Sequence, residues 1–185
     1  MLISKENTCL IIFNMQREFI PSLKNGQNLI DSCCWLVDLA KHFNVPVFIL
    51  NHKDLGTPIS SIKNLAQKAV EIELTNFSCL EDDSFQKIFN TIAKTQFLLA
   101  GAESHISIFQ SAISFKERDK NVFVIADAIL ARNEIDHNIA MKRLTLLNIP
   151  LITKEMVFFE FIRQSQYPNY IDMSLKFLDG RYIRE

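Results

Sequence analysis

The sequence predicts a three-layer α/β/α fold around a mostly parallel, doubly wound sheet of about five to six strands. Short apolar runs without alternation, at residues 9–13 and 122–126, suit strands that are covered on both faces. Amphipathic stretches with helical spacing separate such runs, and this alternation is typical of parallel sheets. Residues 44–48 and 148–152 share an Asn–apolar–Pro–apolar–apolar pattern, in which Asn can end a helix and Pro can begin a strand. These two joints predict βα units.

In the first half of the chain, a strand at 9–13 is followed by a helix whose apolar residues recur at helical spacing. They are Leu29, Ile30, Cys33, Leu36, Val37 and Ala40. Asn44 ends this helix before a strand at 45–50. We then expect a polar loop at 51–61, a short helix at 63–69, a short extended segment at 70–74 and an amphipathic helix at 83–93.

The second half continues the alternation with a strand at 97–100, a buried helix at 106–118 and a strand that ends at Asp127. Asn133 is expected to cap a helix at 134–147. The apolar side chains predicted to face inward from this helix are Ile135, Ile139, Leu144 and Leu147. A strand at 151–153 and helical segments at 156–163 and 170–177 complete the expected elements.

Bulk composition predicts one domain, residues 1–185, in a cytoplasmic protein. The charge is balanced, with 20 Lys and Arg against 21 Asp and Glu, which gives no indication of a nucleic-acid partner. We expect no secretory signal, and no apolar run reaches the roughly 20 residues of a membrane helix. Cys9, Cys33, Cys34 and Cys79 lack CxxC spacing, so we expect reduced, buried thiols.

Polar segments follow several of the predicted strands, at residues 14–19, 51–54, 101–107 and 127–132. Because ligands of such sheets bind outside the carboxyl ends of the strands, these segments are the expected site. The turn at Gly101 leads from a strand into a helix, and it places backbone N–H groups and a positive dipole end at the sheet edge. Ser107 lies in the first turn of that helix.

The chain resembles the isochorismatase-like cysteine hydrolases, a family that includes nicotinamidases, almost from end to end. The segments that carry the resemblance are LIIFNMQREF (10–19), IELTNFS (72–78), GAESHISI (101–108), ADA (126–128) and RNEIDH (132–137). The family uses an Asp, a Lys and a Cys in catalysis. By this resemblance, Asn14, Leu74 and Ser107 stand at those three positions.

A thiol with a pKa near ~8.5 becomes a nucleophile when a cation and a helix N-terminus favour its anion. A serine hydroxyl instead requires an adjacent base, which the amide of Asn14 is not, and Leu74 supplies no cation. We therefore predict a pseudoenzyme that binds a small molecule or serves as a subunit. A further interpretation is an inactive subunit that assembles with active relatives. The alternative is an active hydrolase of a small amide or related substrate, with Ser107 or Cys79 as its nucleophile.

The resemblance also implies an oxyanion hole formed by backbone at Glu103 and Ser107, and a cis peptide bond at Ala102–Glu103. For the Glu103 side chain itself, a structural role is favoured over acid catalysis. The residues expected to line the pocket are Gln16, Phe19, His52, Phe77, His105 and Ile106.

The partners we expect are a small-molecule ligand of unknown identity and further copies of the chain, in a dimer or higher homo-oligomer. Phe158, Phe159 and Phe161 suit either a subunit interface or the core. Some relatives hold a metal through an Asp-x-His pattern, which residues 51–54 do not reproduce. We expect no metal and no cofactor.

Overall fold

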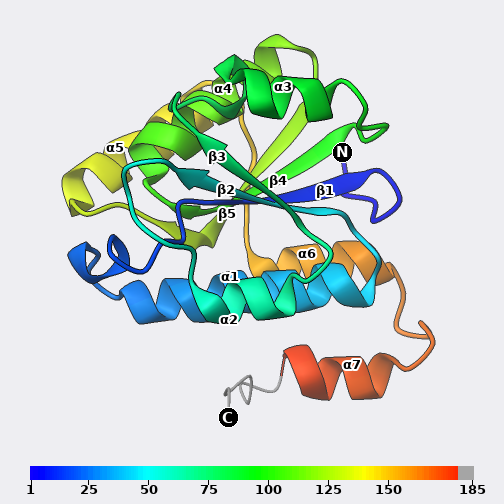
Figure 1. The fold of residues 1–185 in the computed structure, drawn as a ribbon. Coiled ribbons are helices and arrows are strands. Elements are labelled where there is room, and N and C mark those ends of the chain that lie inside the picture. Colours follow the sequence, from blue (N-terminus) through cyan, green and yellow to red (C-terminus); the bar gives the residue numbers. More distant parts are fainter. Residues whose placement is uncertain (179–185) are drawn as a thin grey trace.

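The computed structural model describes residues 1–178 and contains a six-stranded sheet in the order β3-β2-β1-β4-β5-β6 (Figure 1). Every neighbouring pair of strands is parallel. The strands are β1 (Thr8–Phe13), β2 (Val47–His52), β3 (Val70–Leu74), β4 (Gln96–Ala102), β5 (Asn121–Leu130) and β6 (Leu151–Ile152). The predicted parallel, doubly wound α/β fold is confirmed, and the strand order reverses between β1 and β4.

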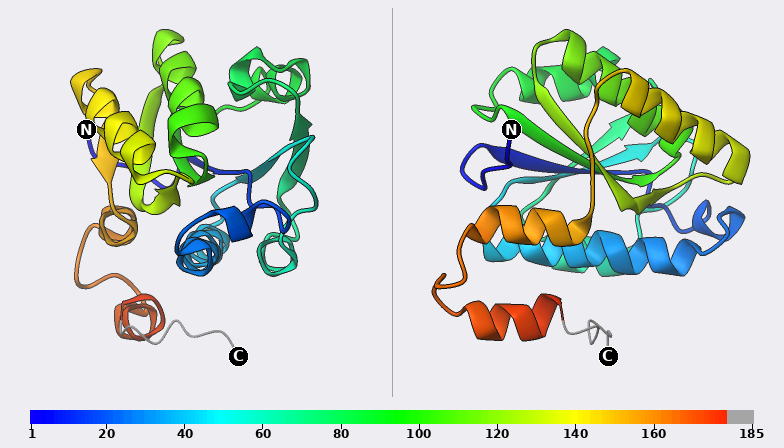
Figure 2. Two further views of the ribbon diagram at one scale, coloured as in Figure 1. Left: turned by 90° about the vertical axis from the view of Figure 1, so that its left-hand side faces the viewer. Right: turned by 180° about the vertical axis from the view of Figure 1, so that it is seen from behind.

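Helices cover both faces of this sheet (Figures 1 and 2). They are α1 (Gly26–His42), α2 (Ser60–Leu65), α3 (Asp83–Phe89), α4 (Phe109–Glu117), α5 (Glu134–Leu146), α6 (Lys154–Ile162) and α7 (Tyr170–Phe177). In Figure 1, α1, α2 and α6 lie below the sheet and α3, α4 and α5 lie above it. Side chains of β1 alternate between the two resulting cores, with Leu10 and Ile12 in the lower core and Ile11 and Phe13 in the upper one.

The last helix, α7, lies outside the three predicted layers, beneath α1 and α6 (Figure 2). The Trp35 indole of α1 donates a hydrogen bond to the Phe177 carbonyl at 2.8 Å. Lys176 forms an ion pair with Asp38 at 2.7 Å. These contacts hold α7 against the outer side of α1.

Both predicted Asn–x–Pro joints are present. Asn44 and Asn148 follow α1 and α5 with left-handed φ values of 56° and 53°. This is the conformation in which Asn is tolerated after a helix. The predicted cap of α5 is also confirmed, since the Asn133 side chain accepts a hydrogen bond from Ile135 N at 2.9 Å.

The predicted inward face of α5 is wrong. Leu144 is fully buried, but Ile135, Ile139 and Leu147 are 71%, 49% and 40% exposed. An α-helix turns about 100° per residue, so Ile135 and Leu144, nine positions apart, lie on opposite sides. The helix packs instead through Ala140 and Leu144.

Several helix boundaries differ from the prediction. The helix expected at 63–69 is α2, which begins at Ser60 and ends at Leu65, because a turn at 66–69 leads into β3. The helix expected at 83–93 ends at Phe89. The helix expected at 106–118 begins earlier, as a π-helix over Ser104–Ile108, before α4.

The strand predicted to end at Asp127 continues to Leu130 as β5. Its pairing with β4 shifts, because Leu99 lies opposite Val124 whereas Gly101 lies opposite Ile129. Asp127 is therefore within the strand, and its carboxylate accepts a hydrogen bond from Lys154 N, at the start of α6, at 2.9 Å. It does not join the other polar segments.

The predictions for cysteine and for the C-terminal phenylalanines have separate outcomes. All four cysteines are buried, as expected. Phe158 and Phe161 are core residues, whereas Phe159 is 41% exposed. Within residues 1–178, no helix combines the length and the apolar character that a membrane crossing requires.

Candidate functional site

The candidate site lies where β1 and β4 end side by side. Asn14 follows β1 in a left-handed conformation, with φ 53°, and its backbone N–H donates to Leu50 O at 2.8 Å. Gly101 in β4 allows the two strands to approach closely, since a Cβ at this position would lie 2.1 Å from Phe13 O. The π-helix that follows β4 carries Ser107 towards the end of β1.

Asn14 and Ser107 are in direct contact. Asn14 Nδ2 donates a hydrogen bond to Ser107 Oγ at 3.0 Å, although the residues are 93 positions apart. Asn14 is 2% exposed and Ser107 is 3% exposed, so the bond is shielded from water. Within residues 1–178, the Ser107 oxygen thus accepts a hydrogen bond from the Asn14 amide, and this amide is not a base.

Leu74 ends β3, two strands away from β1. It is 2% exposed and belongs to the upper apolar core, together with Phe13 and Ile108. This position therefore contributes a buried hydrocarbon side chain to the neighbourhood of the site and no charge.

Glu103 is a buried carboxylate between two potential cations. Its Oε1 lies 3.0 Å from Arg132 Nε, and its Oε2 lies 3.5 Å from His105 Nδ1. No closer hydrogen bond satisfies either Glu103 Oε2 or His105 Nδ1 within the described chain. The Arg132 side chain is half exposed and extends over the Phe19 ring, 5.8 Å from its centroid. This ion pair supports the predicted structural role for Glu103.

The predicted cis peptide bond at Ala102–Glu103 is wrong, since residues 1–178 contain no cis peptide bond. Glu103 instead adopts a left-handed conformation with φ 63° and ψ 65°. The chain reverses at this residue, and Glu103 O accepts a hydrogen bond from Ile106 N at 3.0 Å. The turn is thus made by the left-handed backbone of Glu103 and not by a cis peptide bond.

A second pair joins the turn to α5. Ser104 Oγ lies 3.0 Å from His137 Nδ1. Burial lowers the pKa of His137 below its ordinary value, with Glu134 opposing this shift and His105 adding to it. A neutral imidazole can accept the Ser104 proton, and Ser104 is fully buried. We infer that this pair holds the π-helix against α5.

Gln16 and His52 connect β1 to the loop after β2. The Gln16 side chain accepts from His52 N at 2.9 Å and donates to His52 O at 2.9 Å and to Gly56 O. The His52 ring stacks on Phe77, with centroids 5.5 Å apart, and Phe77 is 50% exposed. These expected pocket residues form one connected group beside Asn14, whereas Phe19, His105 and Ile106 lie around Glu103.

Cys79 begins a short 3-10 helix, Cys79–Glu81, between β3 and α3. Its thiol is fully buried, and burial raises the pKa of Cys79 to about 12. Its backbone N–H donates to Ser111 Oγ at 3.0 Å. A thiolate is strongly disfavoured in this environment. Among the residues that the structure describes, no group of three or more His, Cys, Asp or Glu could hold a metal ion.

Comparison with known proteins identifies the family. Residues 8–156 match the model of the isochorismatase domain, and this range contains every site residue discussed above. The chain belongs to the isochorismatase family. Isochorismatase domain-containing protein 2 from Danio rerio is 24% identical over 170 residues, which are 91% of this chain and 85% of the relative.

Two solved structures share the fold at lower identity. A MAR1 ribonuclease from Caenorhabditis elegans has a TM-score of 0.89 and 22% identity, covering 100% of this chain and 95% of the other. The YcaC gene product from Escherichia coli, described as an octameric hydrolase of unknown specificity, has a TM-score of 0.84 and 21% identity. That match covers 95% of this chain and 96% of YcaC. Both likenesses support the isochorismatase-family fold.

The sequence placed Arg132 in the polar segment 127–132 of the expected site, but it predicted no contact for Arg132 and no site role for His137. Both residues also lie in the segment RNEIDH, which carries part of the resemblance. Arg132 is 29 residues away in the chain from its partner Glu103, and His137 is 33 residues away from its partner Ser104. Only the packing of α5 against the π-helix brings these pairs together.

Proposed function

We propose that this isochorismatase-family protein has lost the cysteine-dependent hydrolysis of its family and binds a small molecule at the carboxyl edge of β1 and β4. The proposal assigns Asn14, Leu74 and Ser107 to the positions of the family's Asp, Lys and Cys. The hydrogen bond from Asn14 Nδ2 to Ser107 Oγ carries this assignment. It places the first and third of these residues in contact, with neutral side chains on both.

The chemistry of the pair supports inactivity. A serine nucleophile must transfer its proton to a neighbouring base as it attacks. Asn14 donates its amide proton to the serine oxygen and has no basic nitrogen. Leu74 provides no positive charge that would stabilise an anion. None of the three residues can therefore take the role that its charged or ionisable counterpart has in the family.

The loss of all three groups together is also consistent with stability. A buried charge that loses its partner destabilises the fold by several kcal/mol, whereas burial of a neutral hydrogen-bonded pair has a much smaller free-energy cost. Asn14 and Ser107 form such a neutral pair, and Leu74 adds to the apolar core. The site can thus remain folded without the family's charged groups.

A ligand screen tests this proposal. Melting temperatures are measured with small amides, small acids, and nicotinamide-like and pteridine-like compounds, and any stabilising compound is analysed for products. We expect stabilisation without product, and weaker stabilisation for Phe77→Ala, because Phe77 is a half-exposed ring of the site. Phe159→Ala is the matched control on α6. Product formation contradicts inactivity, and a ligand effect unchanged in Phe77→Ala contradicts the location.

A second candidate function is hydrolysis by altered machinery, with Ser107 or Cys79 as nucleophile. The contact between Glu103 Oε2 and His105 Nδ1 favours it, because a carboxylate at Nδ1 leaves Nε2 as a proton acceptor. The burial and raised pKa of Cys79 argue against that thiol. Product formation that is lost in both Ser107→Ala and His105→Gln would establish this candidate.

We also propose that the protein forms a homo-oligomer. Its support is the exposed apolar surface of α5, where Ile135 and Ile139 are 71% and 49% exposed and Leu146 is 81% exposed. These three residues recur at i, i+4 and i+11 and share one side of the helix. The octameric assembly of YcaC adds support from a protein of the same fold.

A further inference from the structure

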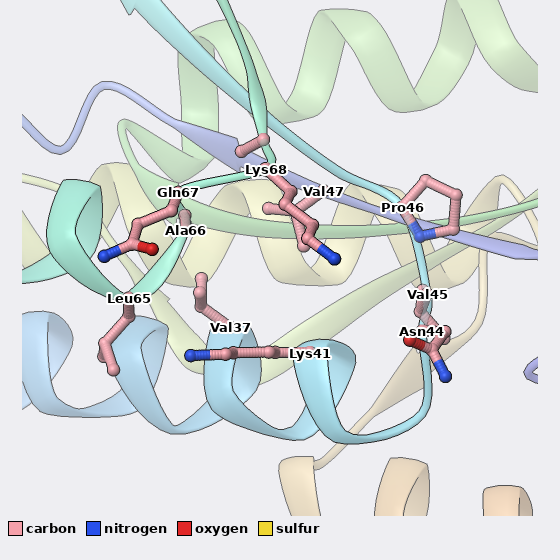
Figure 3. A pocket seen from close by; sticks show the side chains of 11 residues that line it. Val37, Lys41, Asn44, Val45, Pro46, Val47, Leu65, Ala66, Gln67 and Lys68 are labelled. Atoms are coloured by element: carbon pink, nitrogen blue, oxygen red, sulfur yellow. The ribbon is translucent and has the colours of Figure 1, made fainter.

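A separate cavity lies at the opposite edge of the sheet from the candidate site. It has a volume of about 280 Å³ and is enclosed by the last turns of α1, the start of β2 and the turn between α2 and β3 (Figure 3). The amino end of β2 is at this edge, whereas Asn14 and Ser107 lie where β1 and β4 end. No residue proposed for the carboxyl-edge site lines this cavity.

Apolar and cationic side chains line different parts of this cavity. Val37, Val45, Val47 and Leu65 provide hydrocarbon surface. Lys41 and Lys68 provide two ammonium groups, and none of the described residues that line the cavity is acidic. In Figure 3, the Lys68 side chain points from the turn towards α1, and the Lys41 side chain lies along α1 beneath it. The two lysines come from separate elements and border the same space.

The charge at this cavity is uncompensated. Neither Lys41 nor Lys68 has an ion pair or a side-chain hydrogen bond within residues 1–178, whereas nearby Lys63 pairs with Glu71 at 3.1 Å. The whole chain has a formal net charge of −1, so a cavity lining with two lysines and no acidic residue is a local feature. An anion placed between them would offset their mutual repulsion.

We propose that this cavity binds a small amphipathic carboxylate. The carboxylate head lies between Lys41 and Lys68, and an apolar body of a few carbon atoms lies against Val37, Val45 and Val47. The cavity volume is close to the lower end of the roughly 300–1,000 Å³ of small-molecule sites, which limits the ligand to a short chain or a single ring. This inference is independent of the function proposed for the carboxyl edge.

Lys41 also has a structural role that an experiment must separate from binding. It lies in the last turn of α1, where a cation interacts favourably with the helix dipole. Lys68 lies three residues beyond the end of α2 and is outside any helix. Ligand binding requires both lysines, whereas stabilisation of α1 requires Lys41 alone.

The test is a titration of the full chain, followed by the amide signals in heteronuclear NMR spectra at low ionic strength. The probes are hexanoate, its neutral counterpart 1-hexanol, and hexylamine as a cation. We expect hexanoate to shift the amides of Val45, Val47, Ala66 and Ala69, with hexanol at least about tenfold weaker and hexylamine without effect. Lys41→Gln/Lys68→Gln should weaken hexanoate binding about tenfold.

The matched control is Lys24→Gln/Lys142→Gln, which removes the same charge from two exposed lysines outside the cavity. It should bind hexanoate within about twofold of the parent chain. Three results would overturn the proposal: no shift of the four amides at hexanoate concentrations on the order of 10 mM, equal binding of hexanol, or unchanged binding in Lys41→Gln/Lys68→Gln. If Lys41→Gln/Lys68→Gln lowers the stability of the chain but leaves hexanoate binding intact, Lys41 stabilises α1 and does not bind the ligand.

Discussion

Asn14 and Ser107 illustrate what single residues contribute to the site. Each could be assigned to the site from its position after a predicted strand, and their contact could be expected from parallel topology. The geometry of the contact could not, because it depends on the left-handed backbone of Asn14 and on the π-helix that carries Ser107. Donation from Asn14 leaves the serine oxygen without a base.

Substitution of Ser107 tests this contact. Ser107→Ala removes the acceptor and leaves the buried Asn14 amide without it, so the free energy of unfolding should fall by about 1–2 kcal/mol. Urea unfolding measures the change. Ser84→Ala, at an exposed position of α3, is the control and should change stability by less than about 0.5 kcal/mol. An unchanged unfolding free energy in Ser107→Ala would show that the contact adds nothing.

His137 predicts a pH dependence of stability. Burial lowers the pKa of His137 in the folded chain below the 6.5 of an unperturbed histidine, so the unfolded chain binds the proton more readily. The contribution of neutral His137 to the free energy of unfolding is fully present above about pH 6.5. It decreases as the pH falls below this value and through the lower pKa of the folded chain. Urea midpoints between pH 7.5 and 5 should therefore decrease less in His137→Gln than in the parent chain. Equal slopes would contradict this assignment.

At the scale of secondary structure elements, the strand–turn–helix unit at β4 depends on the close approach of Gly101 to β1. Gly101 has φ 116°, and an added Cβ would lie 2.1 Å from the Phe13 carbonyl oxygen. Backbone atoms of a central strand cannot move away without loss of sheet pairing. The site geometry is thus tied to the absence of a side chain at this position.

A pair of glycine substitutions tests this dependence. Gly101→Ala should destabilise the chain by at least about 3 kcal/mol, because both the φ value and the backbone clash oppose it. Gly56→Ala is the matched control, with φ 93° and its nearest contacts on the flexible Glu18 side chain. Its cost should be about 1–2 kcal/mol. Chemical denaturation compares the two variants, and equal costs would contradict the importance of the β1–β4 contact.

The elements show where sequence patterns were sufficient. Continuous apolar runs and Asn–x–Pro joints placed the strands, because buried parallel strands leave little choice of residue. The pattern failed for α5, where Ile135 and Ile139 are apolar but face outward. It also failed for Asp127, since a polar residue after an apolar run does not always end a strand. The cis peptide bond at Ala102–Glu103 was implied by the family resemblance, and it was wrong because the left-handed backbone of Glu103 makes the turn instead.

At the scale of the whole molecule, the fold and its family were accessible from the sequence, since the five segments that carry the resemblance follow one another in the family's order. The contacts of Arg132 and His137 were not, because they depend on how α5 packs against the π-helix. The exposure of Ile135 and Ile139 could not be predicted from the sequence for the same reason. Apolar residues on a helix indicate burial, but they do not tell whether the covering surface belongs to the same chain.

Association of copies through α5 is the prediction at this scale. Sedimentation velocity should show an oligomer for the parent chain, and Ile135→Glu/Ile139→Glu should shift it towards the monomer, because charges would be buried in the interface. Ile171→Glu/Leu175→Glu on α7 is the control, since these residues are 72% and 57% exposed on another helix. A monomeric parent chain, or dissociation by the α7 variant alone, would contradict an interface at α5.

The most direct test of the central proposal is turnover of nicotinamide and isochorismate by the purified protein, compared with its Ser107→Ala variant. Because the hydrogen bond to Ser107 Oγ within residues 1–178 comes from the Asn14 amide, which is not a base, we predict product formation no faster in the parent chain than in the variant. Turnover at ordinary enzyme rates that disappears in Ser107→Ala would contradict the proposal and establish an active hydrolase.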